Sequence, residues 1–161
     1  MIIYIMNYLL EVFNYIGQNG PLILLGILLI LLFIYKSTTL FWIVFILCAI
    51  NSQINYILKG IFKQPRPNFI GGPINNNHVY GMPSGHSQSS SFFTSLIIRL
   101  FKTQNLYINY IKLFSLLLVI ITGLQRIYYK FHTIGQVLAG WTMGIINAQL
   151  SIQLLKSFNL F

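Results

Sequence analysis

Acidic side chains are almost absent from this chain of 161 residues, which has one Glu, at position 11, and no Asp. A pair of carboxylates therefore cannot form, which excludes glycosidase and aspartic-protease chemistry. The same shortage excludes a Ser-His-Asp triad and argues against a magnesium or calcium site held by carboxylates. The single cysteine, Cys48, excludes an internal disulfide and a zinc site built from cysteines.

Charge of either sign is also scarce, since 7% of the residues are charged and 56% are hydrophobic, whereas soluble domains carry about 25% charged residues. The ten Lys and Arg residues give a net charge of +9, but they punctuate long apolar runs rather than clustering on polar segments. This pattern is typical of a membrane protein with cations at helix ends and in functional sites. It argues against a nucleic-acid partner.

Apolar segments predict membrane-spanning helices, each of which needs about 20 mostly apolar residues. Five such segments are Pro21–Tyr35, Ser37–Leu58, Pro83–Phe101, Leu106–Leu124 and Ile134–Leu155. The first residues, 1–20, contain the stretch Ile2–Ile16 before the breaker GQNGP, which predicts either a short sixth span or a helix in the membrane interface. We therefore expect an all-α, integral membrane helix bundle with five or six transmembrane helices, folded as a single domain over residues 1–161.

Following these spans alternately through the membrane assigns the cations to two faces. One face holds Lys59, Lys63, Arg66, His86, Arg126, Lys130 and His132, and the other holds Lys36, Arg99, Lys102, Lys112 and Lys156. Lys59, Arg66 and Arg126 are candidates for chemistry and are set aside in the comparison. The second face then carries more Lys and Arg, and the positive-inside rule predicts that it is cytoplasmic.

Three stretches on the first face carry residues suited to chemistry: KGIFKQPRP, YGMPSGHSQ and LQRIYYKFHTIGQ. Their candidate site residues are Lys59, Arg66, Ser84, Gly85, His86, Arg126, His132 and Gln136. Buried cations without acidic partners are costly unless a ligand supplies the negative charge. Arg, Lys and the backbone N–H groups of a helix start all bind phosphate oxygens. With no acid available, the two histidines are the natural general acid and nucleophile.

Each of these features also has a plain structural interpretation. Lys59 and Arg66 could simply flank a membrane span, Pro83-Ser84 could be an ordinary helix entry, and His132 could be a packed interfacial residue. His78, in the polar loop from Gly60 to Met82, is interpreted in that structural way. The coincidence of three such stretches on one membrane face favours a phosphate site.

The three stretches resemble the signature motifs of the type 2 phosphatidic acid phosphatase superfamily, which includes the vanadium haloperoxidases. Lys59 to Pro67 fits the first motif, Pro83 to His86 fits the second, and Arg126 and His132 fit the third, within a motif-bearing core of residues 59–140. Two positions depart from the family pattern: Gln125 stands where Ser is usual, and Gln136 stands where Asp is usual.

The flanking residues resemble the dolichyl-diphosphatase branch, which tolerates Gln at the usual Asp position, although Gly85 stands where that branch often has Ser. The resemblance implies a metal-independent phosphatase without a cofactor, in which His132 attacks phosphorus and His86 protonates the leaving oxygen. The residues implied to hold the phosphoryl oxygens are Lys59, Arg66, Ser84, Gly85 and Arg126.

The favoured substrate is a polyprenyl diphosphate such as dolichyl diphosphate, with the enzyme in the endoplasmic reticulum membrane and its site on the lumenal side. One alternative is a phosphatase for phosphatidic acid or another lipid monophosphate. Another is a catalytically impaired protein that only binds lipid phosphates, for which Gln125 and Gln136 are the motivation. The sequence leaves the oligomeric state open.

Gln136 follows His132 by four residues, so the two share a face if the helix has begun by His132. The amide oxygen of Gln136 could then accept the proton on one imidazole nitrogen and leave the other nitrogen free to attack. We therefore predict that Gln136 orients His132.

Overall fold

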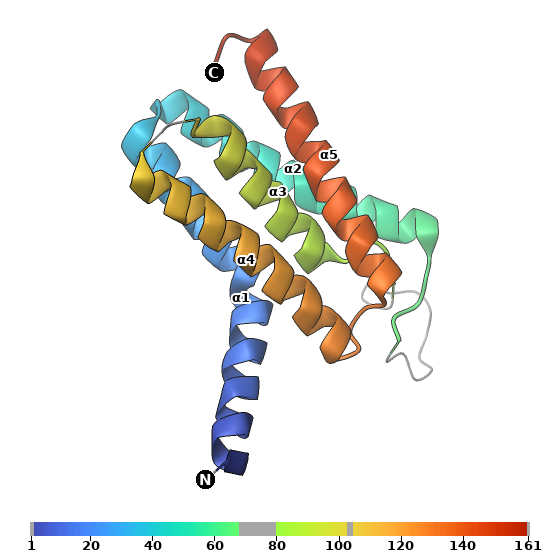
Figure 1. Ribbon diagram of the computed structural model, residues 1–161. Helices are drawn as coiled ribbons and strands as arrows, with labels where there is room; N and C mark the ends of the chain where they lie inside the picture. Colours follow the sequence, from blue (N-terminus) through green and yellow to red (C-terminus); the bar gives the residue numbers. More distant parts are fainter. Residues whose placement is uncertain (1, 68–79, 103–104, 161) are drawn as a thin grey trace.

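The computed structural model describes residues 2–67, 80–102 and 105–160, and it contains five helices. They are α1 (Ile2–Tyr35), α2 (Thr38–Phe62), α3 (Gly85–Leu100), α4 (Leu106–Tyr128) and α5 (Ile134–Ser157). Figure 1 shows that the helices form one bundle, which confirms the prediction of an all-α fold. By length and composition, α1, α2 and α4 can each cross a membrane. The chain is a multi-pass membrane protein.

The short helix α3 occupies the centre of the bundle and packs on all four of the other helices (Figure 1). Its first half is rich in hydroxyl and amide side chains, including Ser87, Gln88, Ser90 and Ser91, and all four are buried. Surrounded by other helices, α3 does not need the apolar exterior that a lipid-facing helix needs. Its central position therefore explains its low hydropathy.

The contact between α3 and α5 is the most extensive in the bundle, and it depends on small residues. Gly140 and Gly144 lie one turn apart on α5, and a Cβ added at Gly140 would lie 2.6 Å from the carbonyl oxygen of Ser84. The Ser91 hydroxyl donates a hydrogen bond of 3.1 Å to the carbonyl of Trp141. Small residues let two helix backbones approach closely, which drives packing where the hydrophobic effect between helices is weak.

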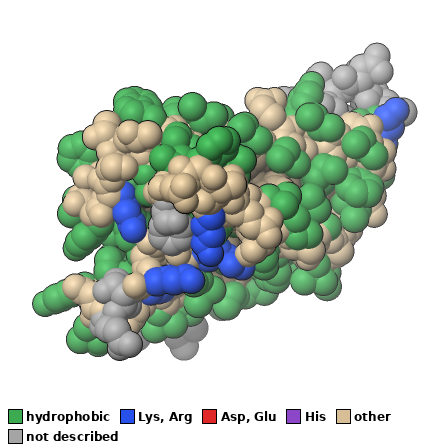
Figure 2. Space-filling view, turned by 90° about the horizontal axis from the view of Figure 1, so that it is seen from above, with side chains coloured by type: hydrophobic (Ala, Val, Ile, Leu, Met, Phe, Trp, Pro, Cys, Tyr) green, Lys and Arg blue, Asp and Glu red, His purple; other side chains and the backbone are tan. Residues whose placement is uncertain are grey.

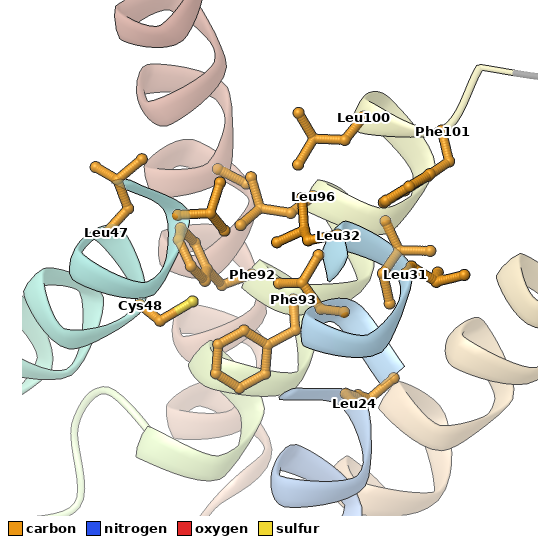
Figure 3. Close-up of a cluster of buried hydrophobic side chains, with 14 of the residues drawn as sticks. Leu24, Leu31, Leu32, Leu47, Cys48, Phe92, Phe93, Leu96, Leu100 and Phe101 are labelled. Atoms are coloured by element: carbon orange, nitrogen blue, oxygen red, sulfur yellow. The ribbon is translucent and has the colours of Figure 1, made fainter. Parts of the chain in front are cut away.

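Large apolar side chains fill the other half of α3. Figure 3 shows Phe92, Phe93 and Leu96 meeting leucines of α1 and residues Leu47 and Cys48 of α2. The polarity of α3 therefore changes along its length, from hydroxyl-bearing at its first turns to apolar at its end. This gradient places the polar half of the central helix at the end of the bundle where the three motif stretches lie.

The predicted break in the sequence GQNGP is wrong, because α1 is one continuous helix of 34 residues with Pro21 inside it. Gly17 and Gly20 face α4, where a Cβ at Gly17 would meet the side chain of Gln125 and one at Gly20 would meet that of Thr122. Close packing at these glycines offsets their weak helix propensity. At 1.5 Å per residue α1 is about 50 Å long, and its first part extends past the bundle in Figure 1.

Two predicted helix ends are also wrong, since α2 continues beyond Leu58 to Phe62 and α4 continues beyond Leu124 to Tyr128. Lys59 and Arg126 therefore lie in the last turns of helices rather than in loops. Both predicted spans end close to a cation, but a cation can stay within a helix where it faces the interior of the bundle.

The predicted alternation of the spans is confirmed. Figure 2 looks onto the end of the bundle where α1, α3 and α5 end and where α2 and α4 begin, and Lys and Arg side chains gather there. Lys36 and Lys102 line a cavity of about 240 Å³ at this end. The motif stretches lie at the opposite end.

The close approach of α3 and α5 predicts that Gly144→Ala destabilises the protein. A Cβ at Gly144 would lie 2.9 Å from the backbone nitrogen of Phe92, so the helices must separate, at a cost of about 1–3 kcal/mol. The matched control is Gly26→Ala in α1, where an added Cβ has no atom within 4 Å. Thermal unfolding in detergent should show a lower midpoint for Gly144→Ala alone, and equal midpoints for the two variants would contradict this interface.

Candidate active site

The three motif stretches come together through backbone hydrogen bonds. The N–H of Gly81 donates to the carbonyl of Gln64 at 2.7 Å, and Pro65 and Tyr80 form an antiparallel bridge, so the first and second stretches are joined. The N–H of Ser84 donates to the carbonyl of Gln136 at 3.0 Å, which joins the second stretch to the third. These contacts assemble one site from three distant parts of the chain.

The side-chain amide of Gln136 is 1% exposed and joins the first stretch to the third. Its Nε2 donates to the carbonyl of Pro65 at 2.9 Å and to Oε1 of Gln64 at 3.1 Å, and its Oε1 accepts from the N–H of Thr133 at 3.2 Å. A carbonyl can only accept and a backbone N–H can only donate, so these partners fix which end of the amide is which.

His132 lies against this oriented amide, with its Nδ1 3.1 Å from Oε1 of Gln136. Because an amide oxygen only accepts, Nδ1 must carry the proton, and Nε2 of the neutral ring holds the free lone pair. The N–H of His132 donates to the carbonyl of Arg126 at 3.1 Å, which ties the loop back to the end of α4. The predicted contact between Gln136 and His132 is therefore present, but the helix has not begun by His132, because α5 starts at Ile134 and His132 lies in the loop before it.

Two arginines bring unused hydrogen-bond donors into the site. Arg126 is 6% exposed and lies with its Cζ 5.1 Å from the centre of the Phe131 ring. Its Nε and Nη2, and the Nε of Arg66, are buried without a hydrogen-bond partner among the described residues. Buried donors without acceptors are costly, and on a cation they fit an anion that arrives as a ligand.

The charges of the site act on His132 together. Burial and the charge of Arg66 lower the pKa of His132 from 6.5 to about 3, with smaller effects of Lys59 and Arg126 in the same direction and an opposing effect of the hydrogen bond with Gln136. Burial also lowers the pKa of the Arg66 guanidinium. At neutral pH the imidazole is therefore uncharged and three cations surround it.

The start of α3 forms the opposite wall of the site. Ser84 is fully buried and its side chain makes no capping hydrogen bond, so it leaves the first backbone N–H groups of the helix uncapped. A Cβ added at Gly85 would lie 3.8 Å from Nζ of Lys59, which places the lysine at this helix start. The ring of His86 hydrogen-bonds with the backbone of Gln18 in α1.

A cavity of about 380 Å³ opens beside His86, between α1, α2 and α3. Its lining includes Gln18 and Leu22 from α1, Ser52 and Asn55 from α2, and Ser89 from α3. All five side chains are uncharged and four of them are polar, so the cationic site continues into an uncharged recess.

The structure explains one departure from the family pattern. Gln125 is fully buried and its Nε2 donates to Oδ1 of Asn14 at 2.7 Å, so this side chain fastens α4 to α1. Sequence reasoning missed this role, and it also missed Gln64, which accepts from Gln136. His78 lies outside the described residues.

Several buried amides near the site were also missed, although the sequence carried a signal for them. Asn51, Asn55 and Lys59 are spaced four residues apart in an otherwise apolar segment, which puts all three on one face of α2. Polar residues inside a membrane segment usually face the bundle interior. Their hydrogen-bond partners depend on how the helices are rotated against one another, and a single sequence does not state that rotation.

Comparison with known proteins agrees with this arrangement. The profile of the PAP2 superfamily matches residues 39–159. Dolichyldiphosphatase 1 of Homo sapiens is 33% identical over 108 residues, which are 60% of this chain and 44% of that protein. Dolichyldiphosphatase of Saccharomyces cerevisiae is 33% identical over 110 residues, or 62% of this chain and 45% of that protein. The matched region is less than half the length of these relatives.

Two solved structures share the fold. The first transmembrane PAP2-type phosphatidylglycerolphosphate phosphatase from Bacillus subtilis superposes with a TM-score of 0.71 at 20% identity, covering 93% of this chain and 78% of that one. Aquifex aeolicus LpxE superposes with a TM-score of 0.63 at 24% identity, covering 91% and 86% of the two chains. At these identities the likeness establishes the arrangement of helices.

The lowered pKa of His132 predicts that this residue destabilises the protein in acid. The unfolded chain binds a proton at His132 near pH 6.5, but the folded site resists protonation until about pH 3. Stability is therefore complete above pH 6.5 and falls as the pH decreases toward 3, by up to about 2 kcal/mol at pH 5 from this residue.

His132→Asn removes this titration and leaves His86 in place, so it serves as the matched comparison. Unfolding midpoints measured in detergent from pH 7.5 to pH 4.5 should fall more steeply for the wild type than for the variant. Parallel slopes would show that His132 is protonated as easily in the folded site as in the unfolded chain.

Proposed function

The chain belongs to the PAP2 superfamily, and on this premise we propose that it is a metal-independent membrane phosphatase that hydrolyses a lipid diphosphate to the monophosphate. One observation carries the proposal: His132 presents an unprotonated Nε2 among three cations while Gln136 holds its Nδ1–H. Lys59, Arg66 and Arg126 supply the positive charge that phosphoryl transfer requires, a role that magnesium fills in many other phosphoryl-transfer enzymes.

The proposed reaction has two displacements at phosphorus. In the first, Nε2 of His132 forms a bond to the terminal phosphorus while the bond to the leaving oxygen breaks. His86, which takes up a proton when the negative charge of the diphosphate binds beside it, donates that proton to the leaving oxygen. In the second, His86 takes a proton from water as the water oxygen attacks phosphorus, and the bond to Nε2 breaks. Inorganic phosphate leaves, and both histidines return to their starting states.

Ser84 and the backbone N–H of Gly85 complete the proposed phosphate cradle opposite the cations. The uncapped start of α3 supports this role, because its N–H groups and the helix dipole both favour an anion. Gln136 is proposed to keep His132 in the tautomer that leaves Nε2 free. Since an amide cannot stabilise the developing imidazolium as a carboxylate does, Gln136 contributes orientation rather than charge.

The proposed substrate is a polyprenyl diphosphate such as dolichyl diphosphate. The dolichyldiphosphatase relatives support this choice. The competing candidate is a lipid monophosphate such as phosphatidic acid, for which membership of the PAP2 superfamily is the motivation. We also propose that the protein resides in the endoplasmic reticulum membrane with its site facing the lumen, which the dolichyldiphosphatase relatives support.

The test of the function is phosphate release by the purified protein in detergent with excess chelator. We expect release from polyprenyl diphosphate to exceed release from polyprenyl monophosphate and from phosphatidic acid, and to be unchanged by the chelator, since the cations are side chains. Preference for phosphatidic acid would overturn the substrate proposal. Loss of activity with chelator would overturn the metal-free mechanism, and the absence of release from all three lipids would overturn the enzymatic function.

The proposed roles of His132 and Gln136 predict different losses of activity. His132→Ala should abolish release, because it removes the proposed acceptor of the phosphoryl group. Gln136→Ala should lower kcat by about 10- to 100-fold, the size typical of losing a group that orients a catalytic residue. A Gln136→Ala protein with unchanged turnover, beside an inactive His132→Ala protein, would refute the orienting role.

A further inference from the structure

Four buried amide side chains form a continuous chain of hydrogen bonds between α2, α3 and α5. Nδ2 of Asn147 donates to Oδ1 of Asn51 at 2.8 Å, and Nε2 of Gln88 donates to the same oxygen and to the Asn51 carbonyl, each at 3.0 Å. Nδ2 of Asn55 then donates to Oε1 of Gln88 at 2.8 Å and to the carbonyl of Pro83 at 3.3 Å. We call these four residues the amide chain.

The direction of every hydrogen bond in the amide chain is determined. The carbonyls of Pro83 and Asn51 can only accept, so the nitrogens of Asn55 and Gln88 must point at them. Oε1 of Gln88 and Oδ1 of Asn51 then each face a donor, whereas Nδ2 of Asn51 is buried without a partner among the described residues. All four side chains are at most 8% exposed, and Gln88 is fully buried. Hydrogen bonds in such a low-dielectric interior are strong, and breaking one leaves a costly unpaired group.

The amide chain ends at the phosphate-binding turn. The carbonyl that accepts from Asn55 belongs to Pro83, directly before Ser84 and Gly85, and a Cβ added at Gly85 would lie 3.0 Å from Oδ1 of Asn55. On the other side, Lys59 lies one helical turn beyond Asn55 on the same face of α2. Asn55 therefore connects the helix that carries Lys59 to the turn that carries the anion-binding N–H groups.

We propose that the amide chain sets the separation between Lys59 and the turn Pro83–His86, and that Asn55 and Gln88 are positioning residues of the phosphate site. This inference rests on the proposed function for its catalytic consequence. Lys59 belongs to α2, whereas Ser84, Gly85 and His86 open α3, and these two helices must be held in register for one phosphate to touch both. Neutral amides can do this without offering a negative charge that would pair with Lys59.

The alternative is that the amide chain only stabilises the bundle, and matched apolar replacements separate the two roles. Gln88→Met and Asn55→Leu each leave buried partners unpaired, so each should lower the unfolding midpoint. The double variant removes both partners of the bond between Asn55 and Gln88. The fall in its unfolding midpoint should therefore be smaller than the sum of the falls in the two single variants. A purely stabilising role predicts that activity recovers in the double variant together with the midpoint.

A positioning role predicts that kcat for phosphate release stays lowered by about 10- to 100-fold in the double variant, with KM changed much less. Gln53→Met is the control, since it makes the same chemical change at an exposed position of α2 and should leave kcat unchanged. Recovery of wild-type kcat in the double variant would overturn the inference.

Binding of orthovanadate, measured by its effect on the unfolding midpoint, tests the inference independently of turnover. We expect the double variant to bind vanadate about tenfold more weakly than the wild type and the Gln53→Met control. If the wild type binds vanadate but releases no phosphate from any lipid, the proposed function fails. The comparison of vanadate affinity between the wild type and the double variant would still test whether the amide chain positions the phosphate site. Equal vanadate affinity in the wild type and the double variant, or no binding by the wild type, would overturn it.

Discussion

The hydrogen bonds of Gln136 are the interaction on which the site depends, because this one residue contacts all three motif stretches. Its carbonyl accepts from Ser84, its amide nitrogen donates to Pro65, and its amide oxygen faces His132. Only a side chain that both donates and accepts can serve the last two partners at once. An ionised carboxylate has only acceptor oxygens, so one of them would face the carbonyl oxygen of Pro65 without a hydrogen between them. Gln136 therefore lacks the negative charge of an Asp, but it connects two motif stretches through hydrogen bonds that an Asp could not make.

The shortage of acidic residues has a direct electrostatic consequence at this site. Burial lowers the pKa of His132 most, and the charges of Arg66, Lys59 and Arg126 add to this effect because no carboxylate offsets them. The imidazole therefore stays neutral and its lone pair stays available. The same uncompensated charge favours binding of an anion. Other contacts must hold the cations together against their repulsion. Gln136 donates to the carbonyl of Pro65, next to Arg66, and the N–H of His132 donates to the carbonyl of Arg126, so the stretches that carry the two arginines are tied to the same site.

The sequence predicted the helix order and the two groups of cations, because these follow from hydropathy and from the alternation of the spans. It also predicted the contact between His132 and Gln136, but for a different reason than the structure shows, since α5 begins only at Ile134 and the Gln136 side chain reaches back to the loop. It failed at Gly17 and Gly20, whose local tendency to break a helix is overcome by packing against α4. It failed again at Gln125, since nothing local shows that this side chain faces Asn14, more than a hundred residues away. The amide chain escaped prediction for the same reason, because its partners depend on helix rotation rather than on composition.

The residues of the amide chain are uncharged, and the cations of the site explain why. A carboxylate in place of Asn55 or Gln88 would also connect α2 to α3, but it would lie close to Lys59 and would pair with it in a medium of low dielectric constant. The cation would then be satisfied before any phosphate arrived, and binding would have to break that pair. Amides hold the helices in register through hydrogen bonds and do not form an ion pair with Lys59. A chain with a single exposed Glu and no Asp therefore keeps its buried cations for an anion that comes from outside.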